Sequence, residues 1–198
     1  MATTRQYVAP NWDQVYQMLM DLALKIKQSG FIPDLIVGVS RGGWAPGRIL
    51  SDLLENTNTA NLKIEFYVGI EKTAKKPTIT QPISEDIAGK RVLVVDDVSD
   101  TGESLKAAVD HVREKGVADA RTVTVYLKPH TSFKPDFYAI STSDWIIFPW
   151  ERLEATRLLI KEAKSGGRGL SYVRETLERC NFDDKTIDAL FQLANGDV

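Results

Sequence analysis

The sequence predicts an α/β protein with a mainly parallel β-sheet flanked by helices, followed by a helical extension at the C-terminus. Apolar runs of strand length alternate with helical patterns from residue 12 to about residue 150, which is typical of a parallel sheet covered on both faces. After Trp150 only helical patterns remain. The 198 residues are enough for one such domain with a small appendage.

The first third of the chain alternates helix and strand. Apolar residues recur at helical spacing over 12–29, where Asn11 can cap the helix and Gly30 can end it. The elements expected next are a buried strand at 33–39, a helix at 44–56 and an alternating strand at 61–70.

Residues 71–89 differ in character, because they contain three lysines, two prolines and few large apolar side chains. We expect a long surface segment there, since loops of this length are usually functional or disordered. The elements expected after it are a buried strand at 90–97, a helix at 102–116, strands at 121–127 and 136–140, a short aromatic segment at 143–150, and helices within 151–169 and 170–198.

Composition and charge exclude several classes of protein. The net charge of −2 gives no indication of a nucleic-acid partner. No apolar run approaches the roughly 20 residues that span a bilayer, so no membrane partner is expected and a cytoplasmic location is the default. One cysteine and two histidines argue against an internal disulfide and a structural zinc site. Neither a P-loop motif nor a dinucleotide-binding glycine motif is present.

Three carboxylates follow the apolar run at 92–95. Asp96 and Asp97 stand at the end of the expected strand, and Asp100 follows before a helix begins. Ligands of open parallel sheets bind beyond the carboxyl ends of the strands. The alternative from the residues alone is that Asp100 caps the helix and the other two acids are solvated.

The helix that starts near Gly102 can bind an anion. Its first backbone N–H groups are free, and the glycine lets the backbone approach a ligand closely. Thr101 and Ser104 add hydroxyl donors. The turn is therefore a candidate phosphate site beside carboxylates that can hold hydroxyl groups or Mg²⁺.

The stretch VLVVDDVSDTGESL resembles the phosphoribosyl-pyrophosphate (PRPP) binding signature of type I phosphoribosyltransferases. Three further stretches resemble the same family in the same order. VGVSRGGWAPGRIL is similar to its pyrophosphate loop, VYLKP to the strand with a purine-reading lysine, and SDWIIFPWE to the base-stacking segment of xanthine-guanine phosphoribosyltransferases. The resemblance covers residues 34–151 and implies the type I phosphoribosyltransferase fold, with a domain over 1–151 and a helical extension over 152–198.

The resemblance implies transfer of 5-phosphoribose from PRPP to a 6-oxopurine base, with Mg²⁺ as cofactor. Asp100 would be the general acid/base, and Asp97 would contact the metal. PRPP and its phosphates would be bound by Ser40, Arg41, Gly42, Gly43, Asp96, Asp97, Thr101, Gly102, Glu103 and Ser104. A cis peptide is expected between Ser40 and Arg41. Glu103 departs from the small residue common in the family, so its carboxylate should point away from the phosphate.

The base would contact Lys128, Trp145, Ile146 and Glu151. Lys128 would bond the 6-oxo group, which argues against adenine, because a 6-amino group presents donors to an ammonium. Trp145 would stack on the ring, Ile146 would offer backbone groups, and Glu151 would favour a 2-amino group. From the residues alone, an ordinary glycine turn at 40–43 and a surface lysine at 128 remain open.

The resemblance also leaves alternatives open. The segment at about 71–89, with Lys72, Lys75 and Lys76, is either a mobile lid or a solvated loop. A homo-oligomer, either a dimer or a tetramer, is implied. The competing functions are a PRPP- or nucleotide-sensing regulator on the same fold and a phosphoribosyltransferase for another base.

Overall fold

The computed structural model describes residues 6–68 and 75–195 and contains the predicted sheet. The sheet has six strands in the order β4-β3-β2-β5-β6-β7, and all neighbours are parallel except β3 and β4. The strands are β2 (Leu35–Ser40), β3 (Thr59–Val68), β4 (Lys75–Gln81), β5 (Arg91–Ser99), β6 (Asp119–Leu127) and β7 (Phe137–Ser141). The expected α/β fold with a mainly parallel sheet is confirmed.

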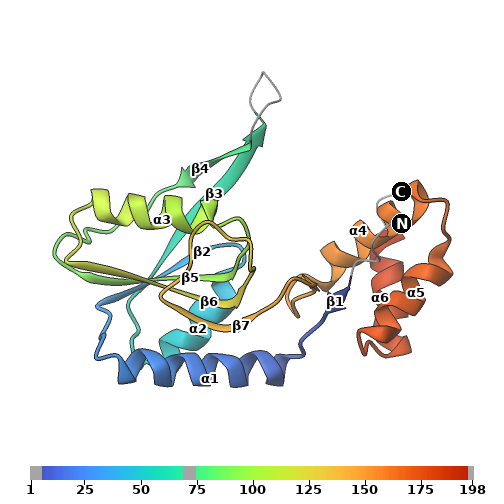
Figure 1. Ribbon diagram of the computed structural model, residues 1–198, viewed down its shortest axis with the longest axis horizontal. Helices are drawn as coiled ribbons and strands as arrows, with labels where there is room; N and C mark the ends of the chain where they lie inside the picture. The colour runs from blue at the N-terminus through green and yellow to red at the C-terminus, as the bar shows by residue number, and fades with distance from the viewer. Residues whose placement is uncertain (1–5, 69–74, 196–198) are drawn as a thin grey trace. The chain divides into compact units, whose positions relative to one another are not determined.

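Helices cover both faces of this sheet, as the apolar runs at its centre require. In Figure 1, α3 (Glu103–Glu114) lies on one face, while α1 (Trp12–Gln28) and α2 (Trp44–Leu53) lie on the other. All six residues of β2 are buried, and the inner strands pack with one side of α3 in a single apolar cluster. The core therefore fixes the carboxyl ends of β2, β5 and β6 at one edge of the sheet.

The start of α1 is capped as its sequence predicts. The Asn11 side chain accepts a hydrogen bond from the backbone N–H of Gln14 at 2.8 Å, and the Gln14 side chain accepts one from the N–H of Asn11 at 2.9 Å. This reciprocal pair satisfies two backbone donors at the helix end. Gly30, with φ +75°, follows the last turn.

Three strands, β1, β4 and β8, were not predicted. The segment expected as a surface loop contains β4, which pairs antiparallel with β3. Lys72 and the rest of 69–74 lie outside the described residues, so the lid interpretation stays a prediction. Near the N-terminus, β1 (Tyr7–Val8) pairs in parallel with β8 (Trp145–Ile146).

The described chain divides into two compact units. Val15–Ser143 form the sheet unit, and the residues up to Gln14 together with those from Asp144 onward form the other. In that second unit, α4 (Arg152–Ser165), α5 (Leu170–Arg179) and α6 (Asp184–Asn195) share an apolar core that includes Val173, Leu177 and Ile187. None of the helices in the described ranges is long and apolar enough to cross a membrane.

Candidate active site

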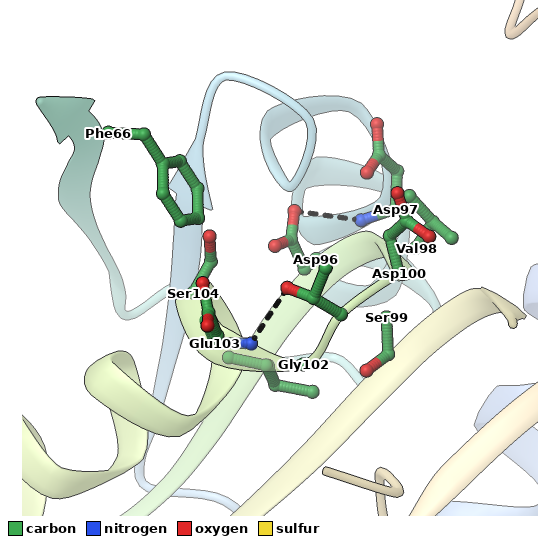
Figure 2. Close-up of a pocket in the computed structure, with 11 residues that line it drawn as sticks. Phe66, Asp96, Asp97, Val98, Ser99, Asp100, Gly102, Glu103 and Ser104 are labelled. Carbon is green, nitrogen blue, oxygen red and sulfur yellow. Dashed lines mark hydrogen bonds between the residues drawn. The ribbon is translucent and has the colours of Figure 1, made fainter. Parts of the chain in front are cut away.

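A cavity of about 470 Å³ opens where β5 ends and α3 begins. Figure 2 shows Asp96, Asp97 and Asp100 around it, with Glu103 and Ser104 from the start of α3 and Phe66 from β3. The sequence places these acids at the carboxyl end of a buried parallel strand, where the chain must turn into the next helix. The structure thus brings together the residues predicted from the PRPP signature.

Asp96 and Asp97 are buried rather than solvated, with 8% of each residue exposed. Asp96 accepts a hydrogen bond from the backbone N–H of Asp97 at 3.0 Å. Burial, together with the neighbouring charge of Asp97, raises the pKa of Asp96 well above its ordinary value. Two buried carboxylates side by side favour a ligand that supplies hydroxyl donors or positive charge.

At the turn into α3, the backbone N–H of Glu103 donates a hydrogen bond to the Thr101 hydroxyl at 3.3 Å. Gly102 is the N-terminal cap of α3, with φ +87° and no side-chain capping bond, so Asp100 does not cap the helix. A Cβ atom on Gly102 would lie 2.6 Å from the backbone nitrogen of Phe133. Glycine is therefore required there both by its positive φ and by the close approach of another chain segment.

The loop after β2 lies against the same carboxylates. The peptide between Ser40 and Arg41 is cis, as expected. A Cβ atom on Gly42 would lie 2.3 Å from a carboxylate oxygen of Asp97. Gly42 therefore lets the backbone of this loop lie directly against the Asp97 carboxylate. Gly43 is buried, and Arg41 is exposed at the surface.

Asn61 on β3 holds both ends of this loop. Its side-chain oxygen accepts hydrogen bonds from the Ser40 hydroxyl at 2.8 Å and from the Trp44 indole N–H at 2.5 Å. The Ser40 hydroxyl also lies 3.3 Å from the carbonyl oxygen of Leu62. The loop is therefore fixed by a neighbouring strand, which is the kind of support that a positioned binding loop needs.

The segment after β6 packs against the turn after β5. Lys128 is 8% exposed and donates its backbone N–H to the carbonyl oxygen of Ser99 at 3.0 Å, so it is not a surface lysine. His130 Nε2 lies 2.9 Å from a carboxylate oxygen of Asp100. The predicted base-reading lysine and the predicted acid/base residue therefore belong to segments in direct contact.

The other predicted base-contacting residues belong to the second unit. Trp145 is 40% exposed, and Ile146 is buried. A Glu151 carboxylate oxygen accepts a hydrogen bond from the backbone N–H of Phe148 at 3.4 Å. Phe148 is buried and stacks on Trp150 with ring centroids 4.8 Å apart, which agrees with a core role for these two rings.

Three residues were missed from the sequence: Phe66, which lines the cavity, Asn61, which bonds the loop after β2, and His130, which bonds Asp100. Phe66 lies on a strand whose alternating apolar pattern was recognised from the sequence. That pattern could have indicated that the Phe66 side chain, which lines the cavity, is 42% exposed. Asn61 and His130 carry no local signal, because their partners are 17 to 30 residues away.

The charged side chains that line the cavity are all acidic. Its lining includes four carboxylates, from Asp96, Asp97, Asp100 and Glu103. Within the described ranges, no group of three or more acidic, histidine or cysteine side chains forms a complete metal site. Magnesium commonly binds one or two carboxylates and completes its shell with water and substrate phosphates, so this arrangement fits such an ion arriving with a phosphate ligand.

Comparisons with known proteins agree with this geometry. A family described as "Phosphoribosyl transferase domain" matches residues 11–152. The xanthine-guanine phosphoribosyltransferase of Gluconobacter oxydans is 28% identical over 150 residues, which cover 75% of this chain and 86% of that protein. The hypoxanthine-guanine phosphoribosyltransferase of Saccharomyces cerevisiae is 29% identical over 153 residues, covering 69% of this chain and 67% of that protein.

A solved structure extends the similarity to three dimensions. The purine phosphoribosyltransferase from Pyrococcus horikoshii is 39% identical, with a TM-score of 0.67, over 73% of this chain and 93% of that one. The family match ends at residue 152, at the first residue of α4, so the rest of α4, α5 and α6 lie beyond it.

Proposed function

The chain belongs to the phosphoribosyl transferase domain family and is a phosphoribosyltransferase, and from that premise we propose that it transfers 5-phosphoribose from PRPP to a 6-oxopurine base. The family resemblance drawn from the sequence is thereby confirmed. The single observation that carries the proposal is the cavity at the end of β5, where buried carboxylates and the first turn of α3 meet the loop after β2.

The phosphoribosyl part of PRPP fits this cavity by its chemistry. Backbone N–H groups of 101–104 would bind the 5-phosphate, and Asp96 and Asp97 would bind the ribose hydroxyls. The loop of residues 40–43 would hold the diphosphate, with Arg41 as a forked donor. Glu103 is exposed, which is compatible with a carboxylate turned away from the phosphate.

Asp100 is the proposed acid/base residue. Carbon 1 of the ribose gains positive character as its bond to pyrophosphate breaks and its bond to the base nitrogen forms. The base loses a proton in this step, and the exposed Asp100 carboxylate, which lines the cavity, would accept it. The remaining catalysis would come from positioning and electrostatics around that carbon.

Mg²⁺ is the proposed cofactor, with Asp97 as the protein group that would contact it, directly or through water. The ion would supply positive charge for the diphosphate, which the carboxylates that line the cavity would otherwise repel.

The base is proposed to be guanine, xanthine or hypoxanthine. Lys128 supports this, because a buried ammonium near the turn after β5 can donate to a 6-oxo oxygen but not to a 6-amino group. The assignments of Trp145 to stacking, Ile146 to backbone contact and Glu151 to the 2-position stay predictions. Trp145→Ala is expected to raise the KM for the base, because stacking contributes roughly 1–3 kcal/mol.

A panel of bases tests the proposal. The full-length protein is incubated with PRPP, Mg²⁺ and one base at a time, and pyrophosphate release is measured. We expect turnover with at least one 6-oxopurine and much less with adenine. Turnover only with a different base would identify another phosphoribosyltransferase. Tight PRPP binding without turnover of any base would indicate the sensing regulator instead.

Three further expectations stay proposals. Residues 1–151 would form the phosphoribosyltransferase domain, with 152–198 as a C-terminal helical extension. The protein would form a dimer or tetramer, which sedimentation of the full chain would measure. A cytoplasmic location also stays a prediction.

A further inference from the structure

The loop between β6 and β7 binds the turn after β5 residue by residue. The turn comprises 99–101, and the loop segment comprises 130–132. One backbone hydrogen bond joins them, from the N–H of Ser132 to the carbonyl oxygen of Thr101 at 2.9 Å. Three side-chain hydrogen bonds join the two segments: Ser99 with Thr131 (2.9 Å), Asp100 with His130 (2.9 Å), and Ser132 with Thr101 (2.7 Å).

Only one of these bonds reaches a proposed reacting group. The bonds of Thr131 and Ser132 end on a hydroxyl and on a backbone carbonyl, so they hold the shape of the turn. The bond of His130 ends on the Asp100 carboxylate, which the proposed function assigns to proton transfer. His130 therefore differs in kind from its two neighbours.

Stability does not explain the Asp100–His130 pair. Their side chains are 61% and 64% exposed, and exposed ion pairs contribute little to the free energy of unfolding. Neither side chain would lose much by facing water instead. An exposed carboxylate with a fixed partner instead gains a fixed orientation, which matters when a proton must be accepted from one direction.

We propose that His130 is a positioning residue for Asp100, an inference that rests on the proposed function. Its ring Nε2–H donates to one carboxylate oxygen of Asp100 and leaves the second oxygen for the base. With one oxygen held by His130, the second carboxylate oxygen of Asp100 keeps a fixed direction from which to accept the proton that the base loses. His130 itself neither gains nor loses a proton in this step.

The same loop also carries the lysine that is proposed to bind the base. Lys128, the proposed base-reading lysine, is two residues before His130, and its backbone is bonded to Ser99. A single short loop therefore carries one group for the 6-oxo oxygen and one group that orients the acid/base residue. The position of the purine and the orientation of Asp100 are thereby set by the same segment.

The test compares His130→Ala with His130→Gln in steady-state turnover of PRPP and the best base from the panel. His130→Ala is expected to lower kcat by roughly tenfold or more, a part of the 10²–10⁴ that acid/base catalysis contributes, while the KM for PRPP changes less than about threefold. His130→Gln keeps an N–H donor and should recover most of the lost kcat. Equal kcat for His130→Ala and the unmodified protein would overturn the proposal.

Two controls separate this inference from its premise. Ser132→Ala removes a bond of similar length from the same loop without touching the carboxylate, and we expect it to alter stability or the KM for PRPP rather than kcat. In an Asp100→Asn background, His130→Ala should add almost nothing, because the two residues act together.

The double variant with Asp100→Asn and His130→Ala also shows which of the two proposals is wrong if the results differ from those expected. If Asp100→Asn itself leaves kcat unchanged, the acid/base role in the proposed function is wrong. If Asp100→Asn is severe but His130→Ala lowers kcat by the same factor with and without Asp100, only the positioning role is wrong. Thermal unfolding of each variant confirms that the exposed substitutions leave the fold intact.

Discussion

Gly42 and Gly43 are neighbours in the loop after β2, but they approach different kinds of atom. A Cβ on Gly42 would meet the Asp97 carboxylate, the end of a side chain that can rotate away. A Cβ on Gly43 would lie 2.2 Å from the carbonyl oxygen of Val95 and 2.6 Å from the backbone nitrogen of Val39, which cannot move without disturbing the sheet. Gly42 is therefore required by the binding site, and Gly43 is required by the packing of the sheet.

This contrast gives a prediction for the two alanine variants. Gly42→Ala should displace Asp97 and raise the KM for PRPP, with little change in the free energy of unfolding. Gly43→Ala should destabilise the protein by about 1–3 kcal/mol or more, as overpacking does. Denaturant unfolding and steady-state kinetics measure the two effects.

Gly47→Ala in α2 is the matched control, because its Cβ would meet only the Cα of Gly38, at 3.8 Å. It should leave kinetics unchanged and stabilise α2 by about 0.5–1 kcal/mol. The account of the loop is contradicted if Gly42→Ala unfolds the protein while Gly43→Ala leaves stability unaltered.

The proposed role of Asp100 gives a second prediction. Asp100→Asn keeps the shape of the side chain but removes its ability to accept a proton. The value of kcat should fall by roughly 10²-fold or more, while PRPP affinity stays within a few-fold. Rapid-mix kinetics with PRPP titration separates the two quantities, and an unaltered kcat would remove the acid/base role.

Individual residues of the site were predictable where a local motif carries them. The acids and the glycine of the turn after β5, and the cis peptide after Ser40, follow from short contiguous stretches. His130 and Asn61 were not predictable, because each gains its role from a partner on another strand or loop. The capping role considered for Asp100 is wrong, since the cap is Gly102.

At the scale of elements, one ion pair joins the residue before β2 to the first residue of β5. Asp34, just before β2, accepts hydrogen bonds from Arg91 through its backbone N–H at 2.8 Å, its Nε at 3.0 Å and its Nη2 at 2.8 Å. These bonds lower the pKa of Asp34 from 3.8 to about 2. The pair thus fixes the end of the sheet opposite the cavity.

A pH-dependent prediction follows from this lowered pKa. The charged form of Asp34 is favoured in the folded state, so its contribution to stability is present above pH 4 and is lost as pH falls toward 2. Asp34→Asn should lower the Tm at neutral pH, and the difference from the unmodified protein should narrow between pH 4 and pH 2.

Glu55→Gln is the control, because Glu55 is 86% exposed and pairs with Lys27 at 3.5 Å. It should show almost no difference in Tm over the same range of pH. A Tm difference for Asp34→Asn that stays constant from pH 7 to pH 2 would show that the ion pair is not its cause.

Most elements were predictable from periodicity and capping, while β1, β4 and β8 were not. β4 contains Lys75, Lys76 and Pro77, so its sequence indicates a loop, and its strand geometry comes from pairing with β3. β1 is two residues long and exists through its pairing with β8, which is far away in the sequence. Pairing with a distant partner, rather than local propensity, decides such strands.

At the scale of the whole molecule, the chain combines a family domain with helices beyond the family match. The helices predicted within 151–198 form α4, α5 and α6, which share an apolar core, although Leu170 at the start of α5 is 43% exposed. The sequence could indicate that these helices pack, since their stripes are amphipathic. It could not indicate what they do, because no residue motif connects them to the transferase chemistry.

The central claim is that PRPP binds at the junction of β5 and α3, and a crystal structure of the full chain with PRPP and Mg²⁺ tests it most directly. The account predicts the 5-phosphate on the backbone N–H groups of residues 101–104, with the ribose hydroxyls beside Asp96 and Asp97. Bound PRPP elsewhere on the protein, with this cavity free of it, would contradict the account.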